Sequence, residues 1–341
     1  MVKKAGREFT IRDVARSAEV AVGTVSRVLN DHPSVTRDVR ERVQRAIASL
    51  GYERNAVAQS MRSARTHMIA CAIRDFDIPG YVSYVKEAER IFRAADYTFL
   101  LASTANDKAV ELSLLRKFAQ RRVDGVMMTI SDENDPELIA AVEQAKMPLV
   151  LIDREMIQSV DRVAADHRSG ARQATDYLLS LGHRRIALFV GDPHAHPSRS
   201  RIAGYRDAFR AAGLEPDPSL IRDHSLSNEF TFRETAALMQ RPEPPTAVFV
   251  AGIDMLAGAM RALKAAGLAI GRDVSVVSGG DSDLAELSTP AITALQWDRA
   301  EMGRHAAQML LDRVTGRTTE PPRCVRVPVS LVVRESCRPP R

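Results

Sequence analysis

Short apolar runs separated by amphipathic stretches occupy the chain from residue 68 to residue 333, and this alternation restricts its fold more than any other feature. The runs are rich in Val, Ile and Leu, which is typical of parallel strands that are covered by helices on both faces. The pattern predicts an α/β body of two doubly wound halves. The predicted strands are residues 68–73, 98–103, 125–130, 149–153, 162–166, 186–191, 247–252, 274–279, 292–296 and 327–333.

Length and composition exclude several classes of protein. The chain has 341 residues, 45% hydrophobic and 27% charged, which fits two or more globular units. No apolar run approaches the roughly 18 residues of a membrane span, so no membrane partner is expected. The N-terminus lacks the apolar segment of a secretory signal, and the three cysteines show no CxxC spacing. We therefore expect a cytoplasmic protein with reduced thiols.

The excess positive charge lies at the N-terminus. Residues 1–66 contain 13 Lys and Arg against 7 Asp and Glu, whereas the rest of the chain contains 35 against 36. A basic module on a nearly neutral body is the charge layout expected of a nucleic-acid binder, because neutralisation of phosphates supplies most non-specific affinity. A solvated surface rich in arginine is the alternative.

Three helical patterns follow one another in this basic module. The first begins with Thr10 and Asp13 in capping-box spacing, the second covers residues 21–30, and the third lies between Thr36 and Gly51. A tight turn between the first two predicts a helix-turn-helix, whose second helix enters the major groove. A three-helix unit could equally bind protein, but the positive charge favours DNA.

The second helical pattern leaves Val22, Gly23, Ser26 and Arg27 on faces that a partner could touch. The guanidinium fork of Arg27 can pair with O6 and N7 of guanine. The sequence around this helix resembles the N-terminal domain of the lactose-repressor (LacI/GalR) family of bacterial transcription regulators over some sixty positions without a gap. The matching segments are Asp13-Val14-Ala15, residues 24–30, residues 50–52 and residues 55–58.

The resemblance implies a DNA-binding domain over residues 1–54. In it Val22 and Gly23 select the operator sequence and Arg27 contacts a base. Ala21 stands where the family usually has a serine that caps the second helix and touches phosphate. The further residues that the resemblance places along the phosphates are Thr24, Ser26 and Asn30.

Residues 55–62 resemble the hinge helix of the family, and a linker continues to residue 66. Eight residues are fewer than the ~12–15 that a stable isolated helix needs, so we expect this helix to form only against its dimer mate on DNA. Met61 takes the place of an apolar wedge in the minor groove, and Asn55 and Ala58 are also expected to contact DNA. The alternative is a plain linker.

Residues 67–337 resemble the α/β periplasmic-binding-protein-like (type I) effector domain of the same family. The resemblance implies dimerisation and three crossings between two lobes, with a ligand in the cleft outside the strand ends. The matching landmarks are residues 122–125, 152–154, 181–186, 201–205 and 274–277. The implied lobes are residues 68–164 plus 294–322, and residues 165–293 plus 323–337.

The cleft residues differ from the usual family pattern. The resemblance implies that Arg201 binds hydroxyl or anionic groups of a carbohydrate-like effector: a sugar, a sugar acid or a sugar phosphate. One aromatic ring of the family pattern is missing at residues 78–81, and Tyr81 is expected to replace it. Asp254 and Asp281 each lie one place later than the polar residues that relatives usually have. Trp297, the single tryptophan, stacks on the ligand or packs where the lobes meet.

Signals for catalysis and metals are weak. The sequence contains no GxxxxGK[ST], GxSxG or HExxH motif and no GxGxxG after a strand, so we expect no catalytic residues and no cofactor. His194 and His196 form an H-x-H pair without an evident third ligand, so no metal is expected.

The sequence thus predicts an all-α helix-turn-helix DNA-binding domain followed by an effector domain of two lobes. The resemblance implies a sequence-specific transcriptional regulator. We expect a homodimeric repressor that binds double-stranded operator DNA under the control of a small molecule. The alternatives are a solute-binding module without a role in transcription and an α/β enzyme with a fused DNA-binding domain.

Overall fold

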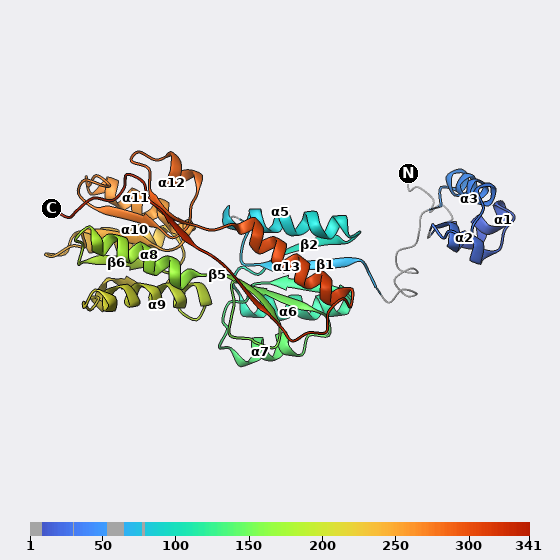
Figure 1. Cartoon of the computed structure of the whole chain (residues 1–341), viewed down its shortest axis with the longest axis horizontal. Coiled ribbons are helices and arrows are strands. Elements are labelled where there is room, and N and C mark those ends of the chain that lie inside the picture. The colour runs from blue at the N-terminus through green and yellow to red at the C-terminus, as the bar shows by residue number, and fades with distance from the viewer. Residues whose placement is uncertain (1–8, 30, 53–64, 77–78) are drawn as a thin grey trace, which may run out of the picture. The chain divides into compact units, whose positions relative to one another are not determined.

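The structure, a computed structural model of the whole chain, describes residues 9–29, 31–52, 65–76 and 79–341. The chain divides into two compact units, Met1–Thr66 and His67–Arg341. Figure 1 shows a small all-helical unit and a larger unit of two α/β lobes.

The first unit contains the three expected helices, which confirms the helix-turn-helix. They are α1 (Ile11–Ser17), α2 (Val22–Leu29) and α3 (Arg37–Leu50). The carboxylate of Asp13 accepts hydrogen bonds from the N–H and the hydroxyl of Thr10, at 2.9 and 2.8 Å, and so fixes the start of α1. Gly51 ends α3 with a φ of 61°, in the left-handed region. The core of the unit consists of Val14, Ala15, Ala18, Val25, Val28, Val43 and Ala46.

The second unit contains two six-stranded sheets, one in each lobe, which confirms the predicted α/β architecture. The first sheet is entirely parallel and has the order β11-β5-β4-β3-β1-β2. Its strands are β1 (Met68–Ile73), β2 (Thr98–Ser103), β3 (Gly125–Met128), β4 (Leu149–Ile152), β5 (Asp161–Ala165) and β11 (Cys324–Val327).

The second sheet has the order β12-β10-β9-β8-β6-β7, and only the pair of β10 and β12 is antiparallel. Its strands are β6 (Ile186–Phe189), β7 (Ile221–Arg222), β8 (Ala247–Val250), β9 (Ser275–Ser278), β10 (Thr293–Gln296) and β12 (Ser330–Val332).

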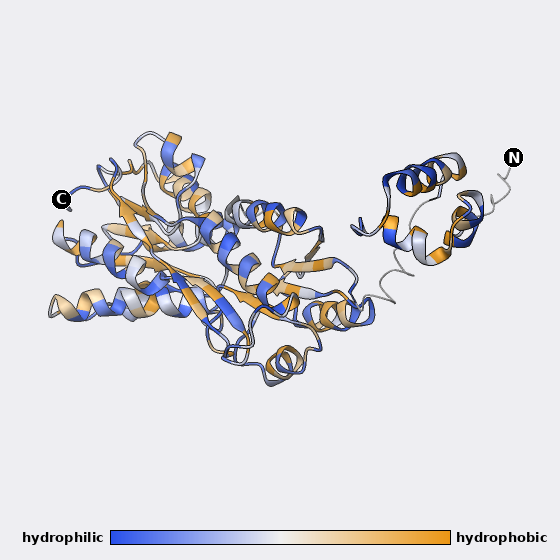
Figure 2. Cartoon of the chain, turned by 45° about the vertical axis from the view of Figure 1, so that its right-hand side comes forward, coloured by the Kyte–Doolittle hydropathy of each residue, from blue (hydrophilic) through white to orange (hydrophobic). Residues whose placement is uncertain are grey.

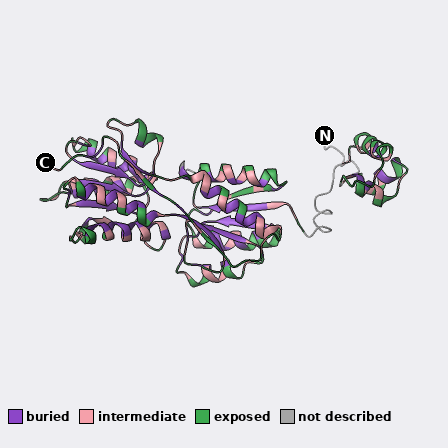
Figure 3. Cartoon of the chain, viewed as in Figure 1, coloured by how far each residue is buried: buried purple, intermediate pink, exposed green. Residues whose placement is uncertain are grey.

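Helices cover both faces of each sheet. Figures 2 and 3 show apolar, buried strands inside each lobe, with the exposed residues on the outer sides of the helices. The helices of the first lobe are α5 (Pro79–Ala94) and α13 (Arg299–Val314) on one face, and α6 (Lys108–Gln120) and α7 (Pro136–Glu143) on the other. Those of the second lobe are α8 (His167–Ser180) with α9 (His196–Ala211), α10 (Asn228–Met239) with α11 (Leu256–Ala265), and the short α12 (Asp283–Leu287).

The three crossings between the lobes come later in the chain than the sequence predicts. The first follows Ala165 rather than residue 164, and β10 stays in the second sheet, so the second crossing follows Gln296. The predicted strand 327–333 is wrong, because it is two short strands in different sheets. Pro328, which has no N–H to donate to a ladder, separates β11 from β12 and marks the third crossing.

No helix among the described residues is long and apolar enough to cross a membrane.

Candidate functional site

The first candidate site is the exposed face of α2. Val25 and Val28 point into the core of the first unit, whereas Val22, Gly23 and Arg27 are exposed. Val22 is 39% exposed at the start of the helix, whereas the two core valines of α2 are buried. This face is therefore available to a partner.

The other predicted DNA-contacting residues divide into two groups. Thr24 and Ser26 are half-buried on α2, beside the exposed face, and Ala21 precedes the helix and is exposed. The remaining four predicted contacts lie outside the described residues. These are Asn30, Asn55, Ala58 and Met61.

The start of α2 has no side-chain cap from Ala21, because alanine carries no acceptor. The carbonyl of Ala21 accepts the N–H groups of Thr24 and Val25 at 2.9 and 3.2 Å, so residue 21 stands at the cap position. We expect Ala21→Ser to raise the free energy of unfolding of the first unit by about 0.5–2 kcal/mol. Thermal unfolding followed by circular dichroism measures the change. Ala21→Val, which offers no acceptor, is the control and should give no such gain.

The second candidate site is a cavity of about 320 Å³ between the two lobes. Its lining comes from the carboxyl ends of strands in both sheets, where open α/β sheets bind ligands. Arg74 follows β1, Ser131 follows β3 and Asp153 follows β4, while Asp192 follows β6 and Asp254 follows β8. The cavity thus lies between the two sheets and is shared by the two lobes.

Four of the five residues predicted for the cleft line this cavity, and the fifth does not. Tyr81, Arg201, Asp254 and Trp297 are part of the lining. Asp281 is outside it, because its carboxylate accepts two hydrogen bonds from the guanidinium of Arg334, at 2.9 and 2.8 Å.

Arg201 lies on α9 and is buried, with 8% of its surface exposed. Its Nε has no hydrogen-bond partner in the part of the chain that the structure describes. Burial lowers the pKa of Arg201 to about 10, so the guanidinium remains charged at neutral pH. The side chain therefore offers the cavity a buried cation with at least one N–H available for a ligand.

Trp297 lies where the chain crosses from β10 to α13, and it also faces the cavity. The guanidinium of Arg299 stands over its ring, 4.3 Å from the centroid, and His167 meets it edge-on at 5.6 Å. The indole Nε1 is buried without a hydrogen-bond partner among the described residues. Both alternatives for Trp297 are thus compatible with its position, since it lies at the crossing and is part of the cavity lining.

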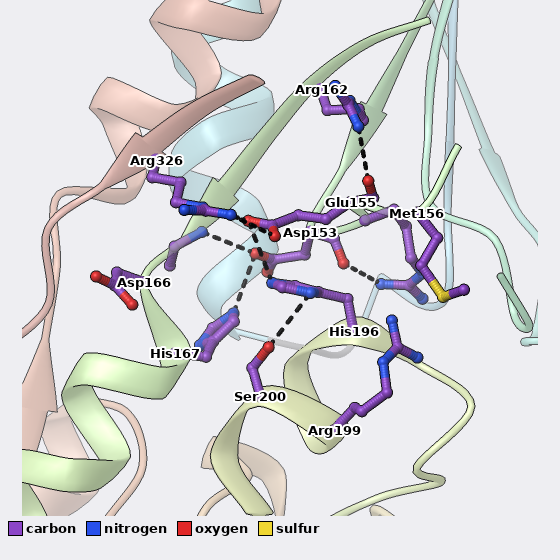
Figure 4. A network of polar contacts seen from close by, with 12 residues as sticks. Asp153, Glu155, Met156, Arg162, Asp166, His167, His196, Arg199, Ser200 and Arg326 are labelled. Carbon is purple, nitrogen blue, oxygen red and sulfur yellow. Dashed lines mark hydrogen bonds and ion pairs between the residues drawn. The ribbon is translucent and has the colours of Figure 1, made fainter. Parts of the chain in front are cut away.

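A polar network joins the lobes beside the cavity (Figure 4). Asp153, in the first lobe, accepts hydrogen bonds from the His167 ring at 3.0 Å and from the N–H of Ala165 at 3.1 Å. Burial alone would raise the pKa of Asp153, but His167 and these hydrogen bonds hold it well below its ordinary value. Burial lowers the pKa of His167 to about 4, and the charge of Arg201 acts in the same direction.

Two ion pairs also connect the lobes. Arg74, after β1, donates to the carboxylate of Asp254, after β8, at 2.7 Å. Arg199, on α9, donates to the buried carboxylate of Glu133 at 3.0 Å. Each pair links a residue of one lobe to a residue of the other, so both ion pairs stabilise the lobe separation seen in this structure.

The buried imidazole of His167 makes stability depend on pH. The unfolded side chain takes up a proton below about pH 6.5, whereas the folded one does so only near pH 4. We therefore expect the thermal midpoint of the full chain to fall as the pH falls from 6.5 to about 4. Burial also lowers the pKa of His183 and of His196, which adds to this fall.

A His167→Gln variant should show a smaller fall over the same pH interval, because glutamine does not titrate. Gln retains an N–H donor for Asp153, so the comparison isolates the proton. The exposed His224 provides the control variant His224→Gln, whose profile should match that of the unaltered chain. Parallel profiles for the two variants would contradict this role of His167.

Several lining residues were not predicted from the sequence. Asp153 and Arg154 lie in residues 152–154, one of the segments that match the family. They directly follow β4, and this position at a strand end could have identified them as cleft residues. Arg299 could not be identified in this way, because it lines the cavity only as a result of the crossing between the lobes after β10, which comes later in the chain than predicted.

Comparisons with known proteins match both units of the chain. Residues 10–55 match the family "Bacterial regulatory proteins, lacI family", and residues 175–337 match a "Periplasmic binding protein-like domain". The transcriptional regulator CelR of Thermobifida fusca is 35% identical over 339 residues, which cover 97% of this chain and 98% of that protein. A solved CelR–cellobiose complex is 34% identical and covers 96% of this chain and 100% of its own, with a TM-score of 0.73.

A lac repressor dimer bound to operator and the anti-inducer ONPF is 27% identical, with a TM-score of 0.86, and covers 97% of this chain and 100% of its own. The similarity thus extends through the helix-turn-helix and both lobes. The chain belongs to the lacI family of bacterial regulatory proteins.

Proposed function

We propose that this chain is a cytoplasmic, homodimeric transcriptional repressor whose affinity for its operator is set by a small molecule in the cavity between the lobes. The exposed face of α2 is the observation that carries the proposal. Family membership sets aside the solute-binding module and the enzyme, because the relatives are transcriptional regulators.

α2 is the reading helix of this proposal. Residues at the start of the second helix of a helix-turn-helix meet base edges in the major groove. Arg27 then pairs with a guanine, while Val22 and Gly23 select neighbouring bases. Ala21, Thr24, Ser26 and Asn30 lie along the phosphates. In residues 55–66, Asn55, Ala58 and Met61 form the minor-groove contact of a hinge helix.

The cavity is the effector site of this proposal. A volume of about 320 Å³ is at the lower end of the range for small-molecule sites, and its lining combines aromatic rings with a few charged groups. The names of the relatives point to carbohydrates, with cellobiose in the CelR complex and a ribose operon repressor among them. A sugar, sugar acid or sugar phosphate fits the hydrogen-bond donors of Arg201 and Trp297.

Exposed apolar side chains support the homodimer. On α12, Leu287 is 79% exposed and Leu284 is 43% exposed, and on β2 Leu100 and Leu101 are also exposed. Apolar groups of this size gain free energy when a second copy covers them. Two copies would present two α2 helices to a pseudo-palindromic operator. An effector that binds one separation of the lobes better than another shifts the population able to bind DNA.

Fluorescence anisotropy with labelled DNA from around the gene tests the proposal. The full chain should bind one fragment far more tightly than a random duplex of equal length, and a variant without residues 1–62 should bind neither. Equal affinity for all fragments and for random DNA would overturn the regulator proposal.

A further inference from the structure

The lining of the cavity contains more cations than carboxylates. Four arginines face it, at positions 74, 154, 201 and 299, together with three aspartates, at positions 153, 192 and 254. Because the pKa of His167 is about 4, that side chain adds no charge at neutral pH. The formal charge of the lining is therefore positive.

The three aspartates already have partners. Asp153 accepts from His167 and from the Ala165 N–H. Asp254 accepts a hydrogen bond from the guanidinium of Arg74, and Asp192 accepts one from the backbone N–H of His194 at 2.8 Å. Among the described residues, none of these carboxylates forms an ion pair with Arg154, Arg201 or Arg299.

The guanidinium groups of Arg201 and Arg299 consequently lack a carboxylate partner in the described part of the chain. Arg299 makes one long hydrogen bond, 3.4 Å to the carbonyl of Asp281, and otherwise stacks on Trp297. Arg201 is buried with an unpartnered Nε. Arg154 differs, since its Nε and Nη1 donate to the carbonyls of Ile130 and Asp153 at 2.7 and 2.8 Å.

One buried and one half-buried cation without an ion-pair partner are unfavourable, and an anionic ligand would relieve that cost. Burial lowers the pKa of Arg299 as well as that of Arg201, and the charge of Arg299 lowers the pKa of Arg201 further, while nearby aspartates act in the opposite direction on both. A carboxylate or phosphate accepts paired hydrogen bonds from guanidinium groups, whereas a sugar hydroxyl leaves their charge unbalanced.

We infer that the effector is an anion, a small ring-bearing carboxylate or phosphate whose charged group binds between Arg201 and Arg299 next to Trp297. The inference rests on the proposed function and narrows it, because it selects sugar acids or sugar phosphates and rejects neutral sugars. It separates this chain from the CelR complex, whose named ligand, cellobiose, carries no charge.

Matched pairs of ligands test the inference on the full chain. Isothermal titration calorimetry compares D-galacturonate with D-galactose, and D-glucose 6-phosphate with D-glucose. Fluorescence of Trp297, the single tryptophan, reports whether the ligand reaches the cavity. At least one acid should bind at least about tenfold more tightly than its neutral partner, because charge-assisted hydrogen bonds are the stronger class. The two pairs separate a carboxylate from a phosphate.

Variants test whether Arg201 and Arg299 bind the charged group of the ligand. Arg201→Gln and Arg299→Gln should each weaken acid binding by at least about tenfold and weaken binding of the neutral sugar by a much smaller factor. Arg210→Gln is the matched control, since Arg210 is on the same helix as Arg201 but is exposed and outside the cavity. It should bind the acid as the unaltered chain does.

Three results would overturn the inference. They are neutral sugars that bind as tightly as their acids, acid binding that Arg299→Gln does not weaken, and the absence of binding by any acid at millimolar concentration. Anisotropy on operator DNA without ligand separates these failures from failure of the proposed function, because operator binding by α2 does not require the anion site.

Discussion

Replacing Arg27 by alanine is expected to weaken binding to the operator by about 1–3 kcal/mol, or roughly 5- to 150-fold, with little effect on random DNA. Arg27 is exposed on α2, beside Val22 and Gly23, and its loss removes a fork of two donors from a base edge. A contact to phosphate would instead affect all sequences alike. Anisotropy titrations of both duplexes at one salt concentration measure the two losses.

Arg16→Ala serves as the control for charge. Arg16 lies in the last turn of α1, and its side chain is 79% exposed. This variant removes the same formal charge from the same unit without touching the reading face. Should Arg27→Ala lose equal affinity for operator and random duplex, Arg27 is a phosphate contact and the assignment of α2 as the reading helix is wrong.

Replacing Glu133 by alanine is expected to cause the largest loss of stability in the effector unit. One oxygen of this buried carboxylate accepts the N–H groups of Glu155 and Met156, at 2.6 and 2.9 Å, and the other accepts from Arg199. Alanine removes all three acceptor contacts. The cost is about 1–3 kcal/mol for each backbone N–H left without a partner, and urea unfolding measures it.

Glu133→Gln retains one side-chain oxygen and should lose less than Glu133→Ala. The surface control is Glu137→Ala, because the carboxylate of Glu137 is largely exposed and, within the described part of the chain, pairs only with Lys108 at 3.1 Å. An exposed pair of this kind is worth about 0–1 kcal/mol. Equal midpoints for Glu133→Ala and Glu137→Ala would refute the structural role of Glu133.

Local pattern was sufficient for the three helices of the first unit and for most strands of the second. The face of Val14, Ala15 and Ala18 forms the core of the first unit, as helical spacing requires. The run 327–333 failed because a strand's apolar residues do not say which sheet it joins. Two residues between β11 and β12 were enough to change lobes, and only the pairing of each strand with its neighbour shows that.

The cavity was harder to predict than the fold because its chemistry depends on partners distant in sequence. Asp281 is bound by Arg334, 53 residues later, and so does not enter the cavity. Asp254 does enter it, yet it is paired with Arg74, 180 residues earlier. A single sequence identifies the charged residues near strand ends. Only the tertiary structure shows which of them form ion pairs with each other.

Both lobes need the segment that contains β11 and β12 before they can be completed during synthesis. β11 completes one sheet at the edge beside β5, and β12 completes the other beside β10. A nascent chain on the ribosome therefore cannot finish either lobe until residues 324–332 have emerged, although the helix-turn-helix, at the opposite end, is made first. During translation the helix-turn-helix therefore exists before either lobe is complete, and a chain that ends before residue 324 would carry the helix-turn-helix without a finished effector domain.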